Sequence, residues 1–137
     1  MTNIEQFDFF KTTDPKTVQM EGWREDERQR RAQVDAGQSV VANVRNDPRL
    51  IAWAKTKGVA AYVGRNPALG SNEFGNPFHI GHDGGRDEVC DKYADYLPKR
   101  PDLLARLAGL KGKVLMCHCH PLRCHGDHLA ELANSQP

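Results

Sequence analysis

The chain has 137 residues, with 19 basic and 18 acidic side chains and a formal net charge of +1. This length is typical of one domain that buries its own hydrophobic core, so neither a metal nor a disulfide is needed for folding. The nearly balanced charge excludes a general electrostatic attraction to nucleic acid or to a membrane surface, and only a local basic patch remains as a phosphate-binding surface.

The first third of the sequence predicts a helical N-terminal extension over residues 1–38, ahead of an α/β domain over residues 39–137. The segment from Gly22 to Ala36 is charged and helix-prone, with few apolar residues, which is typical of a solvated surface helix. The alternative is a basic patch that binds nucleic acid, formed by Arg24, Arg28, Arg30 and Arg31.

Strand and helix patterns then alternate. "SVVANV" (residues 39–44) predicts a strand, followed by a helix with Asp47 as its N-cap, Pro48 at its first position and Gly58 as its stop. "VAAYVGR" (59–65) predicts the next strand and is followed by a polar loop rich in glycine, proline and asparagine.

The second half continues this rhythm. Residues 85–97 carry apolar side chains at helical spacing, residues 101–109 predict a shorter helix, 113–119 a third strand and 125–134 a closing helix. Strands that alternate with helices favour right-handed crossovers. The predicted fold class is therefore α/β, a small Rossmann-like parallel sheet flanked by helices.

Ligands of open parallel sheets bind at the carboxyl ends of the strands, where two unusual loops of this chain should meet. The first places Arg65 directly after a strand and continues to Gly75, Asn76 and Pro77, which combines an anion-binding side chain with a closely approachable backbone. Arg86 adds a second positive charge at a helix start. The plainer interpretation is that these residues only shape a surface loop.

The second loop is rich in cysteine and histidine, with three of the four cysteines and four of the six histidines between Val114 and His128. No apolar stretch approaches the roughly 20 residues of a membrane span, and the first residues lack the features of a signal peptide, so we predict a cytoplasmic protein without a membrane partner. In that compartment clustered cysteines are more often metal ligands or reactive thiols than disulfides.

Three interpretations of this cluster stay open. As a metal site, Cys117, Cys119 and Cys124 with His125 or His128 suit zinc best and iron less well. As a reactive pocket, Cys124 lies at a helix start that favours thiolate, with His125 or Asp127 to handle protons. As a structural cluster, the cysteines only fill the core.

Several motifs in this order resemble a small family of bacterial and phage proteins classed as a domain of unknown function. They are "YVGR", "GNPFHIG", "GRDEVCDKYADYL" and "LKGKVLMCHCHPLRCHGDHLAEL", within residues 59–134. The positions that carry the resemblance are Arg65, Gly75, Asn76, Pro77, Phe78, Cys117, Cys119, Cys124, His125, Gly126 and Asp127.

The resemblance implies that His125 is a better candidate than His128, because the family pattern does not require His128. A more distant similarity, to a group with a strand cysteine and a Cys-His pair at a helix start, implies a Rossmann-like site that handles nucleotides.

We therefore expect an enzyme that acts on a nucleotide, nucleoside or related phosphorylated compound. Arg65, Arg86 and residues 75–78 would hold phosphate and base, and Cys124, His125 and Asp127 would supply the chemistry, with glycosidic-bond cleavage or transfer as one such reaction. The alternatives are a zinc-stabilised module that binds nucleic acid or protein, and a non-catalytic nucleotide sensor.

Overall fold

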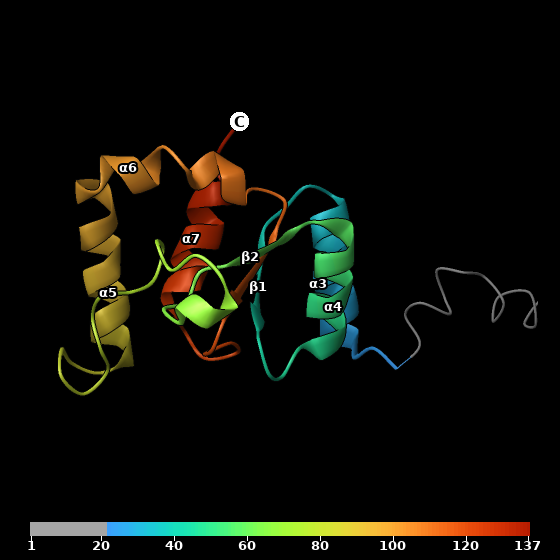
Figure 1. Ribbon diagram of the computed structural model, residues 1–137, viewed down its shortest axis with the longest axis horizontal. Coiled ribbons are helices and arrows are strands. Elements are labelled where there is room, and N and C mark those ends of the chain that lie inside the picture. Colours follow the sequence, from blue (N-terminus) through green and yellow to red (C-terminus); the bar gives the residue numbers. More distant parts are fainter. Residues whose placement is uncertain (1–21) are drawn as a thin grey trace, which may run out of the picture.

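The computed structural model describes residues 22–137 and contains a three-stranded parallel sheet (Figure 1). The strands are β1 (Val40–Asn43), β2 (Ala60–Tyr62) and β3 (Val114–Cys117), in the spatial order β1-β3-β2. Leu115 of the central strand β3 pairs with Val41 on one side and with Ala61 on the other. The prediction of a small parallel sheet within an α/β fold is confirmed.

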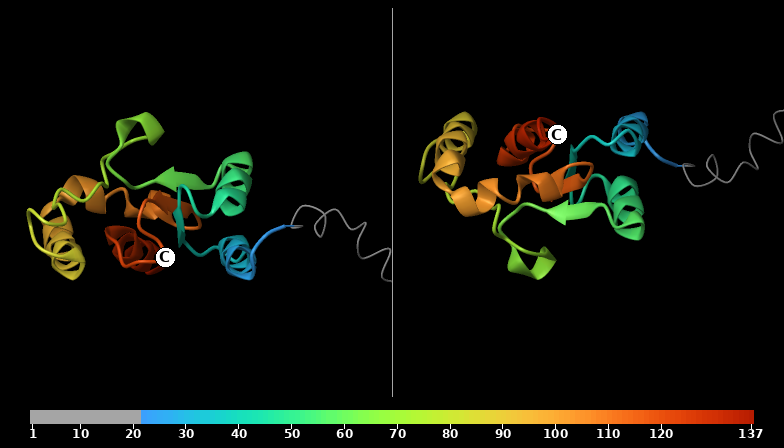
Figure 2. Two further views of the ribbon diagram at one scale, coloured as in Figure 1. Left: turned by 90° about the horizontal axis from the view of Figure 1, so that it is seen from below. Right: turned by 90° about the horizontal axis from the view of Figure 1, so that it is seen from above.

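Helices cover both faces of the sheet, as the two end-on views in Figure 2 show. The helices α3 (Glu25–Asp35) and α4 (Pro48–Lys57) lie together on one face, and α5 (Arg86–Tyr96) and α7 (His125–Asn134) lie on the other. The shorter helical segments are η1 (Pro67–Leu69), η2 (Leu97–Lys99), α6 (Pro101–Leu104) and η3 (Leu107–Leu110). Among residues 22–137 no helix is long and apolar enough to cross a membrane.

The alternation of side chains along the strands divides the core into two clusters. On the α3–α4 face, Val114 and Met116 of β3 pack with Leu50 of α4. On the α5–α7 face, Leu115 and Cys117 pack with helical side chains that include Tyr93 and Leu129. The side chains of β3 are buried on both faces, as expected for the central strand of a parallel sheet.

The start and stop signals of α4 lie where the sequence predicts them. Asp47 is the N-cap, Pro48 occupies the first turn, and Gly58 ends the helix in the left-handed conformation, with φ of 73°. The Asp47 side chain, however, makes no cap hydrogen bond to α4. It is turned instead toward Arg30 and the end of β1.

The helix α3 is not the solvated surface helix that its composition suggests. Glu27, Arg30 and Arg31 are buried, and Glu27 Oε2 accepts a hydrogen bond of 3.0 Å from the backbone N–H of Leu50. Composition alone was misleading because the buried face of α3 carries charged side chains whose partners lie on another helix. Residues 1–21 of the predicted extension lie outside the described residues, and the domain boundary at residue 38 stays a prediction.

A buried, bidentate ion pair connects α3 to the turn between β1 and α4. Arg30 Nη1 donates to Asp47 Oδ2 at 3.0 Å, and Arg30 Nη2 donates to Asp47 Oδ1 at 2.9 Å. The backbone N–H of Asn43 also donates to Asp47 Oδ2, at 2.8 Å. Burial by itself would raise the pKa of Asp47, but these hydrogen bonds and the charge of Arg30 hold it below its usual value.

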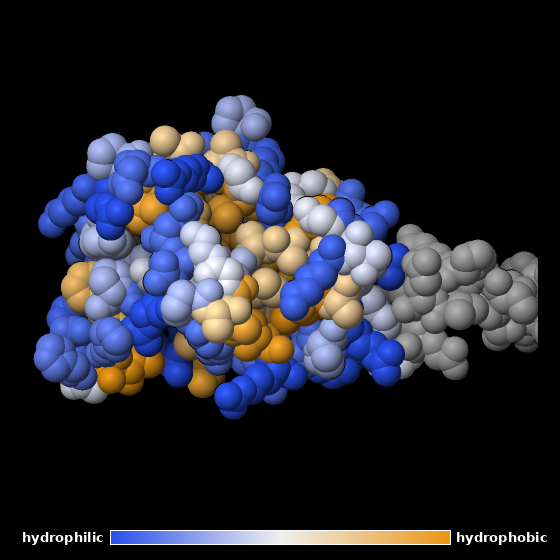
Figure 3. All heavy atoms as spheres, in the orientation of Figure 1, coloured by the Kyte–Doolittle hydropathy of each residue, from blue (hydrophilic) through white to orange (hydrophobic). Residues whose placement is uncertain are grey.

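Space-filling spheres show a mixture of apolar and polar side chains on the face of the molecule drawn in Figure 1, with the apolar ones gathered over its middle (Figure 3). A hollow of about 440 Å³ lies beside the edge strand β2, lined in part by Ala60, Leu69 and Phe74. The hollow is lined mainly by apolar side chains.

Replacing Asp47 by Asn should destabilise the protein by about 3 kcal/mol, because the buried guanidinium of Arg30 loses its buried charged partner and keeps only the exposed carboxylate of Asp26. Urea unfolding measures this free energy, and Asp35→Asn at the exposed end of α3 is the matched control, expected within about 0.5 kcal/mol of the wild type.

The lowered pKa of Asp47 stabilises the fold above about pH 4, and this contribution disappears as the pH falls further. The variant should therefore lose less stability on acidification. Equal stability of variant and wild type at pH 7 would contradict this role.

Candidate functional site

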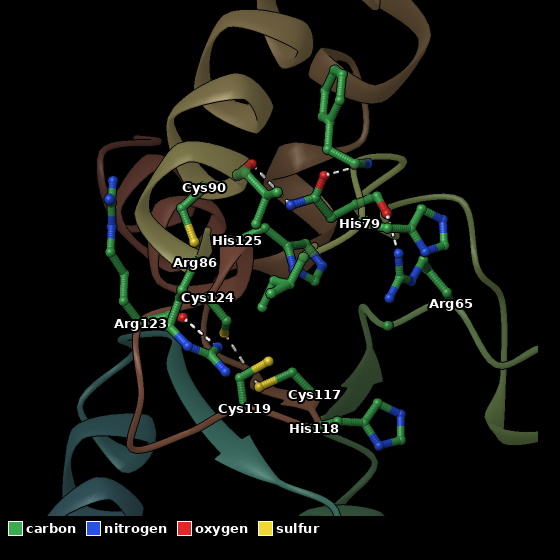
Figure 4. Close-up of a pocket in the computed structure, with 15 residues that line it drawn as sticks. Arg65, His79, Arg86, Cys90, Cys117, His118, Cys119, Arg123, Cys124 and His125 are labelled. Carbon is green, nitrogen blue, oxygen red and sulfur yellow. Dashed lines mark hydrogen bonds between the residues drawn. The ribbon is translucent and has the colours of Figure 1, made fainter. Parts of the chain in front are cut away.

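The loops that follow β2 and β3 meet above the carboxyl edge of the sheet and enclose a cavity of about 230 Å³ (Figure 4). Helices α5 and α7 both begin at this cavity, with Arg86 and His125 as their first residues. The described residues that line it include three arginines, three histidines and four cysteines, but no carboxylate. The cavity therefore presents an excess of positive charge to any ligand.

Most of the site residues predicted from the sequence line this cavity. Those that do are Arg65, Asn76, Phe78, Arg86, Cys117, Cys119, Cys124 and His125. Gly75, Pro77 and Asp127 are not part of the lining. The two unusual loops face each other, as the parallel topology requires.

The loop after β2 is built to hold Arg65 at the cavity. A Cβ atom on Gly75 would lie 2.8 Å from Cγ of Arg65 and 3.0 Å from the carbonyl oxygen of Gly64, so only glycine allows this approach. Arg65 Nη1 donates to the carbonyl of Asn76 at 3.2 Å. Gly75 thus contributes to the site because it has no side chain, which leaves the space that Arg65 occupies.

Asn76 fixes the shape of the same loop. Its Nδ2 donates to the carbonyl of Val89 in α5 at 3.1 Å, and its Oδ1 accepts from the backbone N–H of Phe78 at 2.9 Å. The amide of Asn76 is buried and occupied by these two bonds. Asn76 is therefore a structural support for the loop, and Phe78 is the side chain that lines the cavity, with its ring 6.0 Å from that of Tyr96.

Arg86 and Arg123 bring positive charge to the side of the cavity opposite Arg65, as Figure 4 shows. Arg86 Nη1 donates to the carbonyl of Arg123 at 3.0 Å. Arg123 Nη1 and Nη2 form ion pairs of 3.1 and 2.8 Å with Asp87 and Asp91 of α5. These contacts hold the cysteine-rich loop against α5 and fix one edge of the Arg86 guanidinium.

The sulfur atoms of three cysteines lie together at the base of the cavity. Cys117 and Cys124 are buried, with their Sγ atoms 3.4 Å apart, whereas Cys119 is only partly buried. The pKa of Cys119 falls to about 5, because Cys124 donates a hydrogen bond to its sulfur and Arg86 adds a hydrogen bond and positive charge, against the effect of burial. The pKa of Cys124 is raised by its hydrogen bonds with the sulfurs of Cys117 and Cys119 and by burial.

The pKa shifts therefore favour a thiolate on Cys119 or Cys117 over one on Cys124, although the sequence favoured Cys124 because of its place at a helix start. Cys124 is the N-cap of α7, but its burial and its donation to the neighbouring sulfurs keep it protonated. A helix dipole lowers a thiol pKa only where hydration or charge partners also favour the anion.

His125 anchors α7 to the end of β2. Its Nε2–H donates to the carbonyl of Val63 at 2.5 Å, and its ring packs edge-on against Tyr93 at 4.9 Å between centroids. Burial lowers the pKa of His125, so the imidazole is neutral. One of its two ring nitrogens, Nε2, is thus already engaged in a hydrogen bond within the fold.

The cysteine cluster does not form a ready zinc site. Among the residues described, no three Cys, His, Asp or Glu side chains are placed to hold a metal ion. Zinc–sulfur bonds of about 2.3 Å at tetrahedral angles would hold two thiolates roughly 3.8 Å apart, whereas Cys117 and Cys124 are in closer contact, at 3.4 Å. Zinc or iron at this cluster therefore stays a prediction.

Asp127 lies outside the cavity and caps α7. Its Oδ2 accepts a hydrogen bond of 3.1 Å from the backbone N–H of Cys124, which completes a capping box at the helix start. Its side chain is exposed. The predicted catalytic role of Asp127 has no support from this placement, and the first-turn position that suggested it is explained by capping.

His118 lines the cavity, although it was not among the residues predicted for the site. It directly follows Cys117, the last residue of β3. Tyr62 Oη accepts from the backbone N–H of Asn66 at 2.9 Å and lies 2.7 Å from His118 Nε2. A hydrogen bond between Tyr62 and His118 therefore holds the imidazole in place at the cavity.

Six further lining residues were not assigned to the site from the sequence: Gly64, His79, Ile80, Val89, Cys90 and Arg123. His79 and Ile80 extend the loop that carries Phe78, and Arg123 lies between Cys119 and Cys124. The sequence signal for His79, Ile80 and Arg123 was that each lies in a loop rich in glycine, proline, cysteine or histidine.

Replacing Asp127 by Ala should lower stability by about 1 kcal/mol, because the capping box is lost. Thermal and urea unfolding measure this loss, with Glu131→Ala on the exposed face of the same helix as a control that should change little. Ligand affinity of the folded Asp127→Ala protein should equal that of the wild type. A loss of affinity at unchanged stability would restore a functional role for this carboxylate.

Comparison with known proteins provides a family but no activity. A family model described as a domain of unknown function, DUF4326, matches residues 50–135. No curated protein and no solved structure matches the chain. The matched range runs from α4 to α7 and contains every residue named above as lining the cavity. The chain therefore belongs to the DUF4326 family.

Proposed function

We propose that the protein is an enzyme that acts on a nucleotide or a related phosphorylated compound, bound in the cavity at the carboxyl edge of the sheet. The observation that carries this proposal is the charge of the cavity wall. Its described lining has no carboxylate and contains Arg65, Arg86 and Arg123, of which Arg123 is paired with Asp87 and Asp91 of α5, so that Arg65 and Arg86 are the two arginines offered to a ligand. Phosphate groups are the metabolite anions that arginine binds best, through paired hydrogen bonds.

The placement of the arginines supports binding of a phosphate between them. Arg65 approaches from the loop after β2, and Arg86 approaches from the start of α5 on the other side (Figure 4). The first turn of α7 begins at the same cavity, and its N-terminal dipole adds to the positive potential. A phosphate at this edge would neutralise charges that now face one another across the cavity.

The remaining wall suits an apolar or aromatic part of the ligand. Phe78, Ile80 and Val89 line the cavity, and the Ile80 side chain is exposed at 53%. These apolar side chains offer contact area to a base or another apolar part of the ligand. A cavity of about 230 Å³ is small for a ligand pocket, which favours a mononucleotide or smaller compound over a dinucleotide.

Glycosidic-bond cleavage is supported less well than reaction at the phosphate. Glycosidases generally use a pair of carboxylic acids, and the described lining of this cavity contains none. The groups available to react are the Cys119 thiolate and the imidazole of His118. Such groups suit nucleophilic attack and proton transfer at a phosphorylated ligand.

The alternative of nucleic-acid binding through α3 has less support. Arg24 and Arg30 both pair with Asp26, and both also bind Asp47. Their charge is thus largely compensated within the fold. The binding-module hypothesis loses two of the four arginines on which it depended.

Replacing Arg65 by Gln should weaken the binding of adenosine monophosphate at least tenfold, because a charge-assisted hydrogen bond to phosphate is lost. Isothermal titration calorimetry measures the affinity. The matched control is Arg106→Gln, which removes an exposed arginine that pairs with Glu73 outside the cavity and should leave affinity unchanged. Equal affinity of both variants, or no binding by the wild type of this nucleotide or of inorganic phosphate, would contradict the proposed function.

A further inference from the structure

A second hollow, of about 390 Å³, adjoins the cavity at the carboxyl edge of the sheet. The described residues that line it are Asn43, Arg45, Asn46 and His118. His118 also lines the cavity of the proposed site, so its side chain is a wall that the two spaces share. In the view of Figure 4, His118 lies below both Arg65 and Arg86. A ligand held by these arginines would enter the hollow by extending past His118.

The walls of this hollow are fixed by Asn43, the last residue of β1. Asn43 Nδ2 donates to the carbonyls of His118 and His120, at 3.2 and 2.9 Å. Asn43 Oδ1 accepts from the backbone N–H groups of Arg45 and Asn46, at 2.8 and 3.2 Å. One buried amide thus holds the loop after β1 against the loop after β3, and the hollow is formed before any ligand binds.

The imidazole between the two spaces is also positioned by the fold. Tyr62 Oη lies 2.7 Å from His118 Nε2, and the two rings meet edge-on with their centroids 5.7 Å apart. Tyr62 is buried, and its hydroxyl accepts a hydrogen bond from the backbone N–H of Asn66. A ligand that passes from the cavity into the hollow therefore meets a polar side chain at the boundary.

Arg45 supplies positive charge to the hollow. Its side chain is exposed, and none of the ion pairs within residues 22–137 involves it. The nearest acidic residue in the sequence, Asp47, is buried and paired with Arg30. The described lining of the hollow has no carboxylate either. The charge of Arg45 is therefore available to an anionic group of a ligand.

The chemistry of the two spaces is different. Phe78, Ile80 and Val89 give the cavity an apolar wall, whereas all the described side chains that line the hollow are polar. A base gains apolar contact area in the cavity and none in the hollow. Guanidinium, amide and imidazole groups suit phosphate oxygens instead. The hollow therefore fits a second phosphate better than it fits a base.

From this juxtaposition we infer that the ligand of the site is a nucleoside diphosphate. Its first phosphate lies between Arg65 and Arg86, and its second phosphate extends past His118 and binds Arg45. The inference rests on the proposed function and names the substrate class of the same site. It assigns Arg45 as a further phosphate-binding residue, which sets a preference for a diphosphate over a monophosphate.

The first test compares adenosine diphosphate with adenosine monophosphate by isothermal titration calorimetry of the full chain, without divalent cations. The wild type should bind the diphosphate at least tenfold more tightly, because the second phosphate adds a charge-assisted hydrogen bond. Arg45→Gln should remove most of this preference and leave the affinity for the monophosphate within about twofold of the wild type. Arg49→Gln, which removes an exposed arginine beside Trp53, is the matched control and should keep the preference.

The second test removes the base from the comparison. The wild type should bind inorganic pyrophosphate more tightly than inorganic phosphate, and Arg45→Gln should again reduce the difference. Nuclear magnetic resonance locates the second phosphate independently of affinity. Adenosine diphosphate should shift the backbone amide signals of Arg45 and Asn46 further than adenosine monophosphate does.

The outcomes separate the two proposals. Equal affinity of the wild type for the two nucleotides, a preference for the diphosphate or for pyrophosphate that survives Arg45→Gln, or an equal loss of both nucleotides in that variant would overturn the role of Arg45. Binding of adenosine monophosphate that depends on Arg65 would leave the proposed function intact in each of these cases. A wild type that binds neither nucleotide, nor phosphate, nor pyrophosphate would reject the proposed function itself.

Discussion

The pairing of β3 with a parallel strand on each side is the constraint on which the rest of the structure depends. Val114 and Leu115 are fully buried, and each pairs with both β1 and β2. Because all three strands run in the same direction, the segments that follow them emerge at one edge of the sheet. The loop that carries Arg65 and the loop that carries Cys119 therefore meet, although 54 positions separate these two residues in the numbering.

The two sides of the molecule use charge in opposite ways. Beside α3 and α4, Arg30 and Asp47 satisfy each other inside the fold, and Glu27 binds the backbone of α4. At the carboxyl edge, Arg65 and Arg86 bind backbone carbonyls, Arg86 also lies beside the sulfur of Cys119, and no carboxylate lines the cavity. Charge that is paired within the fold contributes to stability, whereas charge that faces a cavity without carboxylates is available to a ligand.

Most of the fold could be predicted from the sequence, because the strands and the helix ends carry local sequence signals. Pro48 and Gly58 mark the limits of α4, and residues 125–134 were predicted as the helix that the structure contains. The buried face of α3 could not be predicted, since Arg30 finds its partner 17 residues away. In the site, the meeting of the loops followed from parallel topology, but the choice of Cys119 over Cys124 depended on burial and on contacts between side chains, which spacing does not specify.

The central claim is that a phosphorylated ligand binds at the carboxyl edge of the sheet, and a nuclear magnetic resonance titration of the full chain with adenosine monophosphate tests it most directly. The account predicts that the largest chemical-shift changes fall on the backbone amides of Gly64, Arg65, Phe78 and Cys119, which line the cavity. The indole signals of Trp23 and Trp53, in a separate hollow beside α3 and α4, should stay in place. Largest changes at the two indoles, with none at the cavity, would contradict the account.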